Sequence, residues 1–188
     1  MRRRECDSVT MATREVTLVG RYEIGSELGR GDTGVVYRAR DQRIDRTVAI
    51  KTVSVLGLEP DAEQEYRQRL VVEARAAGRL SHPRIVTIFY VAEEPYNLTP
   101  YIVMEYASGR SLEEVLCTEN GTLPLDTALQ VTQELAEALD YAHAQGIVHR
   151  DIKPSNIIVA DDGHPKIDND RPCHEAFFCT VPLSFSTQ

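Results

Sequence analysis

Alternating apolar and polar positions run through much of the first hundred residues. Short segments rich in β-branched and aromatic residues recur between polar turns, and this period of two predicts strands. The expected strands are residues 35–39, 47–51, 85–92 and 101–105. Residues 61–80 differ, because their apolar positions recur three or four residues apart, as on one face of a helix. These positions are Tyr66, Leu70, Ala74 and Ala77.

The second part of the chain has mainly helical spacing. Residues 125–144 form the longest amphipathic segment, and Gly146 follows it where a helix commonly ends. The apolar face expected for this helix consists of Ala128, Leu129, Leu135, Ala138, Leu139 and Ala142. Two short strands, 147–149 and 156–159, are expected around a polar loop. The order of elements predicts an α+β fold, with a β-rich first part and a helical second part.

Composition limits the classes of function. The chain has 188 residues, of which 42% are hydrophobic and 27% charged, as is typical of one globular domain. Its formal charge of −8 argues against non-specific binding to nucleic acid or to an anionic membrane. We find neither an apolar run long enough to span a bilayer nor a secretory signal, and the four cysteines are scattered. We therefore expect a cytoplasmic protein with reduced thiols and no membrane segment.

Three glycines stand at a spacing typical of loops that approach phosphate groups. They are Gly29, Gly31 and Gly34, and Val36 follows two residues later. Backbone amides that are free of side chains can come close to phosphate oxygens. Dinucleotide-binding folds use the same spacing, but there the glycines open a helix. Because β-branched residues follow at once here, the segment predicts a strand, a turn and a second strand.

A lysine ends the strand expected at 47–51. If Lys51 is buried it needs an acidic partner, because an unpaired buried cation is costly. Glu73 on the predicted helix is the natural candidate. The four residues Val48-Ala49-Ile50-Lys51 by themselves are equally compatible with a surface lysine at the end of a strand.

The most specific motif is the polar segment 149–156, which reads His-Arg-Asp-Ile-Lys-Pro-Ser-Asn. Asp151 can accept a proton from a hydroxyl group, and Asn156 can hold a metal ion.

Taken in order, these motifs resemble the glycine loop, strand lysine, helix glutamate and catalytic loop of the protein kinase family. The resemblance covers residues 21–167 and is greatest to the bacterial relatives of eukaryotic Ser/Thr kinases; Lys153 is typical of Ser/Thr rather than tyrosine kinases. It implies a two-lobe fold that uses ATP and Mg²⁺ and phosphorylates Ser or Thr of protein substrates. The implied organisation is an N-terminal arm 1–20, a β-rich N-lobe 21–103, a hinge 104–108, a partial helical C-lobe 109–168 and a tail 169–188.

The resemblance also assigns site residues. It implies catalytic roles for Asp151, Lys153, Lys51 and Glu73, and metal-binding roles for Asn156 and Asp168. The residues implied to contact the nucleotide are Leu28, Gly29, Arg30, Gly31, Gly34, Val36, Ala49, Lys51, Met104 (the gatekeeper), Glu105, Ala107 and Ile158. The apolar members of this set are equally compatible with ordinary core positions.

The pattern breaks where the family has Asp-Phe-Gly, whose aspartate binds magnesium. An ungapped alignment places Asn169 at the metal position, followed by Asp170 and Arg171, whereas one deleted residue places Asp168 there. An amide oxygen in place of a carboxylate should weaken magnesium binding. Asp170 in the apolar slot of the phenylalanine would have to be buried unpaired or turn outward.

Beyond Pro172 the sequence no longer resembles the family, and this suggests a kinase domain truncated after its catalytic loop. An alternative is a genuine replacement element, whose apolar residues cover the unfinished lobe. These are Phe177, Phe178, Val181, Leu183 and Phe185. Three functions follow: an active Ser/Thr kinase, an ATP-binding pseudokinase or regulatory module, and a non-functional kinase fragment.

Overall fold

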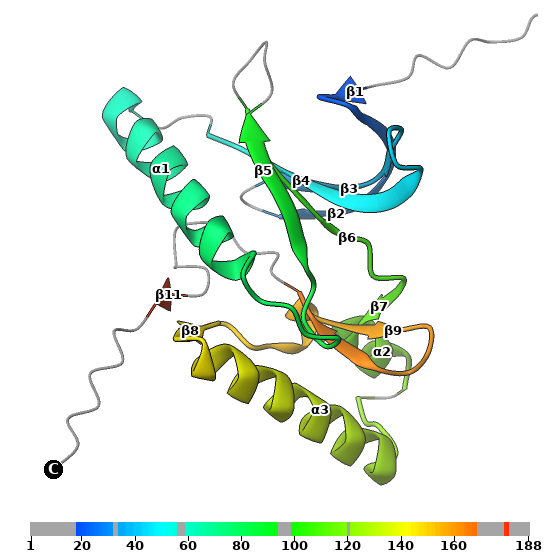
Figure 1. The fold of residues 1–188 in the computed structure, drawn as a ribbon. Coiled ribbons are helices and arrows are strands. Elements are labelled where there is room, and N and C mark those ends of the chain that lie inside the picture. Colours follow the sequence, from blue (N-terminus) through cyan, green and yellow to red (C-terminus); the bar gives the residue numbers. More distant parts are fainter. Residues whose placement is uncertain are drawn as a thin grey trace, which may run out of the picture.

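The first part of the chain is an antiparallel sheet with one helix beside it. The computed structural model describes residues 18–31, 34–55, 59–93, 99–119, 121–168 and 179–180. Within these residues the strands lie in the order β1 (Leu18–Val19), β2 (Tyr22–Gly31), β3 (Gly34–Asp41), β4 (Arg46–Val53), β6 (Pro100–Glu105) and β5 (Ile88–Glu93). Helix α1 (Pro60–Ala77) crosses beside β5 (Figure 1).

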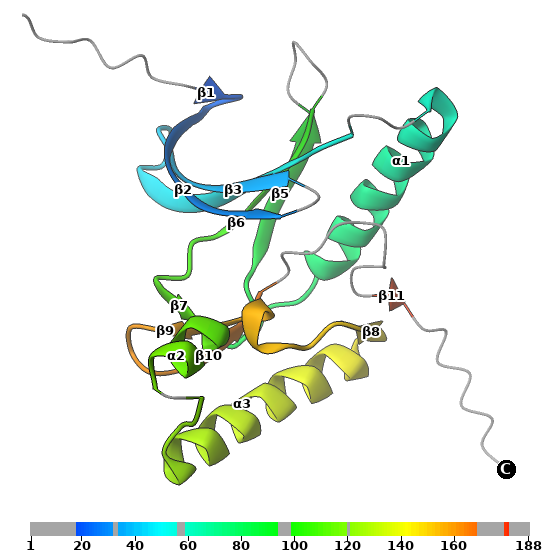
Figure 2. The same ribbon diagram turned by 180° about the vertical axis from the view of Figure 1, so that it is seen from behind.

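The second part lies below the sheet and is built on helices. It contains α2 (Leu112–Thr118), the long α3 (Leu125–Ala144) and the short 3₁₀ helix η1 (Pro154–Asn156) (Figure 2). A small sheet joins β10 (Pro165–Ile167), β9 (Ile157–Ala160) and β7 (Gly109–Ser111), and β8 (Ile147–Val148) pairs with β11 (Cys179–Thr180). The expected α+β fold is confirmed. None of the helices in the described residues has the length and apolar character needed to cross a bilayer.

Strand β4 separates two apolar clusters, because successive side chains of a strand point to opposite faces. Val48 and Ile50 pack in a cluster with residues of β2, β3 and β6. Ala49 and Val53 belong instead to the main core, together with the buried face of α1. That face consists of Tyr66, Leu70, Ala74 and Ala77, as the helical spacing predicted.

Three expectations need correction. Leu129 is 60% exposed, and Val131 is buried in its place. At 3.6 residues per turn these two residues stand about 200° apart, so only one of them can face the core. The strand expected from residue 85 begins at Ile88, since residue 85 makes only an isolated bridge. Leu18–Val19 pairs with β2, so the last residues of the expected loosely ordered arm form a strand; residues 1–17 lie outside the described part.

A buried carboxylate organises the turn between β3 and β4. Asp41 is only 2% exposed, and its Oδ2 accepts the Nη2 of Arg21 at 2.8 Å. Its Oδ1 accepts the backbone N–H of Arg43 at 3.0 Å. Burial by itself raises the pKa of Asp41, but the N–H groups of Arg43 and Ile44 and the Arg21 guanidinium outweigh it. The pKa of Asp41 in the folded chain therefore lies below its usual value.

This shift makes the stability depend on pH. A carboxyl group with a depressed folded pKa stabilises the fold at pH values above its unfolded pKa of about 4. That stabilisation disappears as the pH falls through the folded pKa. We expect Asp41→Asn to flatten the decline of the unfolding free energy below about pH 4, measured by urea denaturation at several pH values. Asp161→Asn, at an exposed carboxylate, is the control; parallel parent and Asp41→Asn curves would contradict the assignment.

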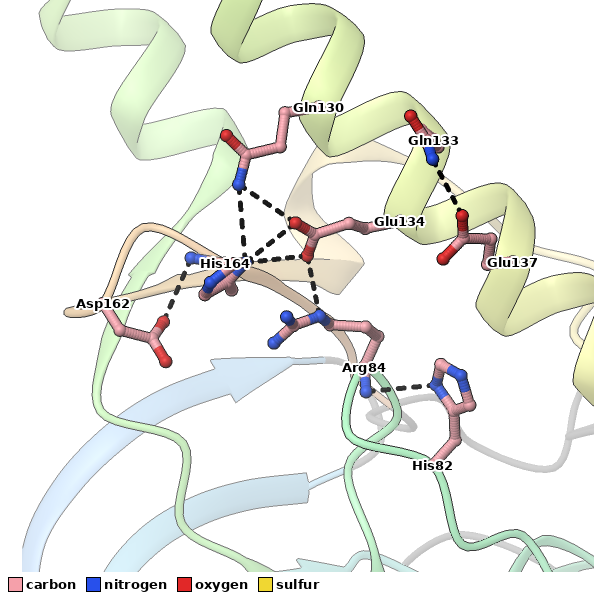
Figure 3. A network of polar contacts seen from close by, with 8 residues as sticks. All are labelled: His82, Arg84, Gln130, Gln133, Glu134, Glu137, Asp162 and His164. Carbon is pink, nitrogen blue, oxygen red and sulfur yellow. Dashed lines mark hydrogen bonds and ion pairs between the residues drawn. The ribbon is translucent and has the colours of Figure 1, made fainter.

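A second polar network joins α3 to two loops (Figure 3). The carboxylate of Glu134 on α3 accepts Nε of Arg84 at 2.7 Å and contacts Nδ1 of His164 at 2.8 Å. Burial alone raises the pKa of Glu134, but hydrogen bonds from Gln130 and His164 and the charge of Arg84 give a net lowering. The network holds the α1–β5 loop and the β9–β10 turn on the same helix.

Candidate active site

A cleft of about 270 Å³ opens between the large sheet and the helical part. Strands β2, β3 and β4 supply one wall, and β6, the segment after it and β9 supply the other. Nine of the residues singled out in the sequence line this cleft: Leu28, Gly29, Val36, Ala49, Met104, Glu105, Ala107, Ile158 and Asp168. The chain therefore brings residues from most of its length to one cavity.

The glycine-rich segment forms two paired strands, β2 and β3, as predicted; the two residues expected to form the turn, 32 and 33, lie outside the described residues. Gly31 pairs with Gly34 where the β2–β3 hairpin closes, so the glycines do not open a helix. Arg30, Gly31 and Gly34 lie at this end of the hairpin, beyond the lining of the cleft, and Arg30 pairs with Glu27 at 2.8 Å. There is no room for a side chain at Gly34, because a Cβ there would stand 1.8 Å from the backbone oxygen of Thr52.

Lys51 is buried in β4, with 2% of its surface exposed. The surface-lysine alternative is therefore wrong. Because strand side chains alternate, Lys51 points to the same face as Ala49 and Val53, which is the face covered by α1. Glu73 is half-buried on α1, next to the core residue Ala74. Both charged groups lie at the interface between sheet and helix, and an ion pair between them stays a prediction.

The catalytic-loop motif brings two side chains, those of Lys153 and Asn156, to the carboxylate of Asp151. The Nδ2 of Asn156 donates to the backbone oxygen of Asp151 at 2.9 Å and also to its Oδ2. The ammonium of Lys153 lies 3.5 Å from the same Oδ2. Since both hydrogens of the Asn156 amide point at Asp151, its Oδ1 points away from the aspartate. The Asp151 side chain is 26% exposed, so a substrate hydroxyl can reach it.

His149 connects this loop to Asp168, which directly follows β10. The backbone N–H of Asp151 donates to Nδ1 of His149 at 3.3 Å, and Nε2 lies 3.1 Å from the backbone oxygen of Asp168. Because Nδ1 accepts, Nε2 carries the proton and donates. Arg150, which lies between His149 and Asp151, has φ 64°, a left-handed conformation that costs a non-glycine residue about 1–2 kcal/mol. The backbone before Asp151 is thus held in one strained geometry.

Two oxygen donors are candidates for magnesium, the amide of Asn156 and the carboxylate of Asp168. The two residues are neighbours, because the backbone N–H of Asp168 donates to the backbone oxygen of Asn156 at 2.9 Å. Among the described residues no group of three or more His, Cys, Asp or Glu side chains could hold a metal ion. Magnesium in phosphoryl-transfer sites typically takes one or two carboxylates and completes its shell with phosphates and water. The donor pair fits this requirement. Asn169, the alternative, lies outside the described residues.

Several lining residues were missed from the sequence. Ser111 and Glu114 line the cleft at the start of α2, and they form a reciprocal capping box. The Ser-x-x-Glu spacing that marks such a box was available in the sequence. Val86 and Ser155 also line the cleft, although no residue pattern distinguishes them from their neighbours; Tyr106, within the expected hinge 104–108, lines it too.

Comparisons with known proteins agree with this geometry. A family profile described as "Protein kinase domain" matches residues 22–169. The chain is 42% identical over 153 residues to "Serine/threonine-protein kinase PksC" of Streptomyces coelicolor. It is 39% identical over 155 residues to "Serine/threonine-protein kinase PknA" of Mycobacterium tuberculosis. The solved structure "PpkA-294 apo form" superposes with a TM-score of 0.73 at 26% identity.

These relatives are longer than the chain. The matched region covers 79% of this chain and 27% of PksC, and 81% of this chain and 35% of PknA. The solved structure is matched over 81% of this chain and 59% of its own chain. The chain thus spans about a quarter to a third of these two curated relatives.

Proposed function

The chain belongs to the bacterial Ser/Thr protein kinase family, and we propose that it transfers a phosphoryl group from ATP to a Ser or Thr hydroxyl of a protein substrate. The observation that carries this proposal is the clustering of Lys153 and Asn156 around Asp151. A base, a cation and a metal-binding oxygen are the groups that phosphoryl transfer requires at one place.

The shape and lining of the cleft support binding of the nucleotide. Val36 and Ala49 from β3 and β4 and Ile158 from β9 line the cleft, and apolar side chains of this kind suit an adenine ring. The cleft volume of about 270 Å³ is near the lower end for small-molecule sites. Lys51 lies deeper on the same face of β4 and would contact the phosphates.

The residues around Asp151 would act on the protein substrate. The Asp151 carboxylate accepts the proton of the Ser or Thr hydroxyl as the hydroxyl oxygen attacks the terminal phosphorus of ATP, and the bond from that phosphorus to the bridging oxygen breaks to release ADP. Lys153 balances the charge of this carboxylate and of the transferred group. Asn156 orients the aspartate through its amide hydrogens. Mg²⁺, held by Asn156 and Asp168, would neutralise phosphate charge.

A second candidate function is an ATP-binding module that does not transfer phosphate. The departure from the family pattern after Ile167 favours it, because an ungapped alignment places an asparagine at the metal position. Such a module would bind nucleotide through the same cleft and act by contacts with partners. A phosphotransfer assay distinguishes the two functions. A nucleotide-binding assay does not, because both functions bind nucleotide.

We expect Mg-ATP to stabilise the parent chain and to lose most of this effect in Lys51→Met. Methionine keeps the apolar part of the buried side chain but removes the charge that would meet the phosphates. Nucleotide at about 100 times its Kd stabilises a folded site by about 2.7 kcal/mol, which raises Tm by about 5–10 °C. The measurement is thermal unfolding of both proteins with and without Mg-ATP.

ATP with excess EDTA is the control for the metal. A rise in Tm in the parent that disappears in Lys51→Met supports the nucleotide site, and transfer of labelled phosphate to a protein substrate then separates kinase from binding module. An equal rise in both proteins would contradict the role of Lys51. No rise in either would refute the nucleotide site.

A further inference from the structure

The side chain of Glu105, at the end of β6, joins three separate parts of the chain. Its Oε1 accepts the ammonium of Lys166 at 2.6 Å. Its Oε2 accepts the backbone N–H of Thr87 at 3.3 Å, and the backbone N–H of Glu105 donates to the Thr87 oxygen at 2.8 Å. A residue that lines the cleft is thus tied through its own carboxylate to β10 and to the segment before β5.

Lys166 belongs to the strand that leads into the site. It lies on β10 opposite Ile158, which lines the cleft, and two residues before Asp168. Its side chain is 19% exposed and that of Glu105 is 25% exposed. Water therefore screens this pair less than an exposed pair, so the contact is stronger than most surface ion pairs.

The backbone completes the connection between these parts. The N–H of Ile167 donates to the oxygen of Arg84 at 2.8 Å, and the N–H of Val86 donates to the oxygen of Ile167 at 2.9 Å. The segment 84–87 therefore pairs with β10 on one side and with Glu105 on the other. The Glu105–Lys166 pair is the side-chain contact that closes this three-way junction.

We propose that Lys166 is a positioning residue for the nucleotide, because its ammonium fixes Glu105 and so fixes the cleft-lining residues at the end of β6. This inference rests on the proposed nucleotide site. Lys166 points at Glu105, so it acts through that residue. Without the ammonium, the carboxylate keeps only the Thr87 N–H, and the backbone of residues 105–107 gains freedom that a bound adenine must then remove.

The test uses Lys166→Met with two measurements on the whole chain. The first is amide hydrogen exchange of the Glu105 N–H without nucleotide, which we expect to become about tenfold faster. The second is the affinity for Mg-ADP, which we expect to fall about tenfold, as the loss of one charge-assisted contact implies. In a double-mutant cycle, Glu105→Gln combined with Lys166→Met should weaken binding no more than Lys166→Met alone.

Arg84→Met is the matched control. It removes an ion pair of similar burial, 22% and 16% exposed, in which the guanidinium contacts Glu134 on α3 (Figure 3). We expect it to lower Tm but to leave the Glu105 exchange rate and Mg-ADP affinity unchanged. If Lys166→Met behaves like Arg84→Met, the inference is wrong. If the parent does not bind Mg-ADP but Lys166→Met still speeds exchange of the Glu105 N–H, the proposed function is wrong, whereas the conclusion that Lys166 fixes Glu105 is supported.

Discussion

Asp151→Asn will lower phosphotransfer about 10³-fold while leaving Mg-ADP affinity within about twofold. Asparagine has the shape of aspartate and keeps an oxygen for the Asn156 amide, so the loop should keep its geometry. It cannot accept the proton of a substrate hydroxyl, and it loses the ion pair with Lys153. The loss is therefore confined to the chemical step, because nucleotide binding does not use this proton.

The measurement is initial-rate phosphotransfer to a Ser/Thr protein substrate, with Mg-ADP titration on the same preparations. Asp161→Asn is the matched control, since it removes one exposed carboxylate from the β9–β10 turn and changes the net charge equally. It should retain the parent rate. A rate for Asp151→Asn within tenfold of the parent would show that Asp151 is not the base.

Gly34→Ala will destabilise the chain by at least about 3 kcal/mol, which corresponds to a fall in Tm of roughly 10 °C. The added Cβ would stand 1.8 Å from the Thr52 oxygen and 2.9 Å from its carbonyl carbon. These are backbone atoms of the neighbouring strand, so no side-chain rotation can relieve the clash. The backbone at Gly34 also has φ 151°, which residues with a Cβ rarely adopt.

Gly31→Ala separates this steric effect from the general cost of replacing a glycine. A Cβ at Gly31 meets no described atom within 4 Å, and Gly31 pairs with Gly34 across the same hairpin. We expect a change in Tm of no more than about 3 °C. Thermal unfolding of both variants tests the expectation. Equal losses of Tm in the two variants would contradict the expectation. They would show that glycine is required by the end of the β2–β3 hairpin, and not by the close approach of β3 to β4.

The sequence predicted the parts of the fold that depend on neighbours in the chain. The helix at 125–144 was predicted with the bounds that α3 has, because periodic apolar positions and a following Gly146 are local signals. The strand–turn–strand around Gly31 and Gly34 followed from the β-branched residues next to it. Leu129 shows the limit of this prediction. It is hydrophobic and was therefore assigned to the apolar face of the helix, although its angle around the helix places it on the exposed side.

The motif spacing of the sequence also determined the chemical groups of the candidate site. Asp151, Lys153 and Asn156 lie within five residues, so a single loop brings them together, and their contacts follow from local backbone geometry. Family membership follows from the same spacings, since the glycine loop, Lys51 and the catalytic loop come in a fixed order.

Only the tertiary structure decided which distant residues support this site. Glu105 and Lys166 are 61 positions apart, and Glu134 meets Arg84 and His164 from 50 and 30 positions away. No local period encodes such pairs, because they depend on how β6, β10 and α3 pack. It also decided the burial of Lys51, since a strand pattern cannot say which face α1 covers. Local spacing therefore identifies the reacting groups, and packing decides what holds them in place.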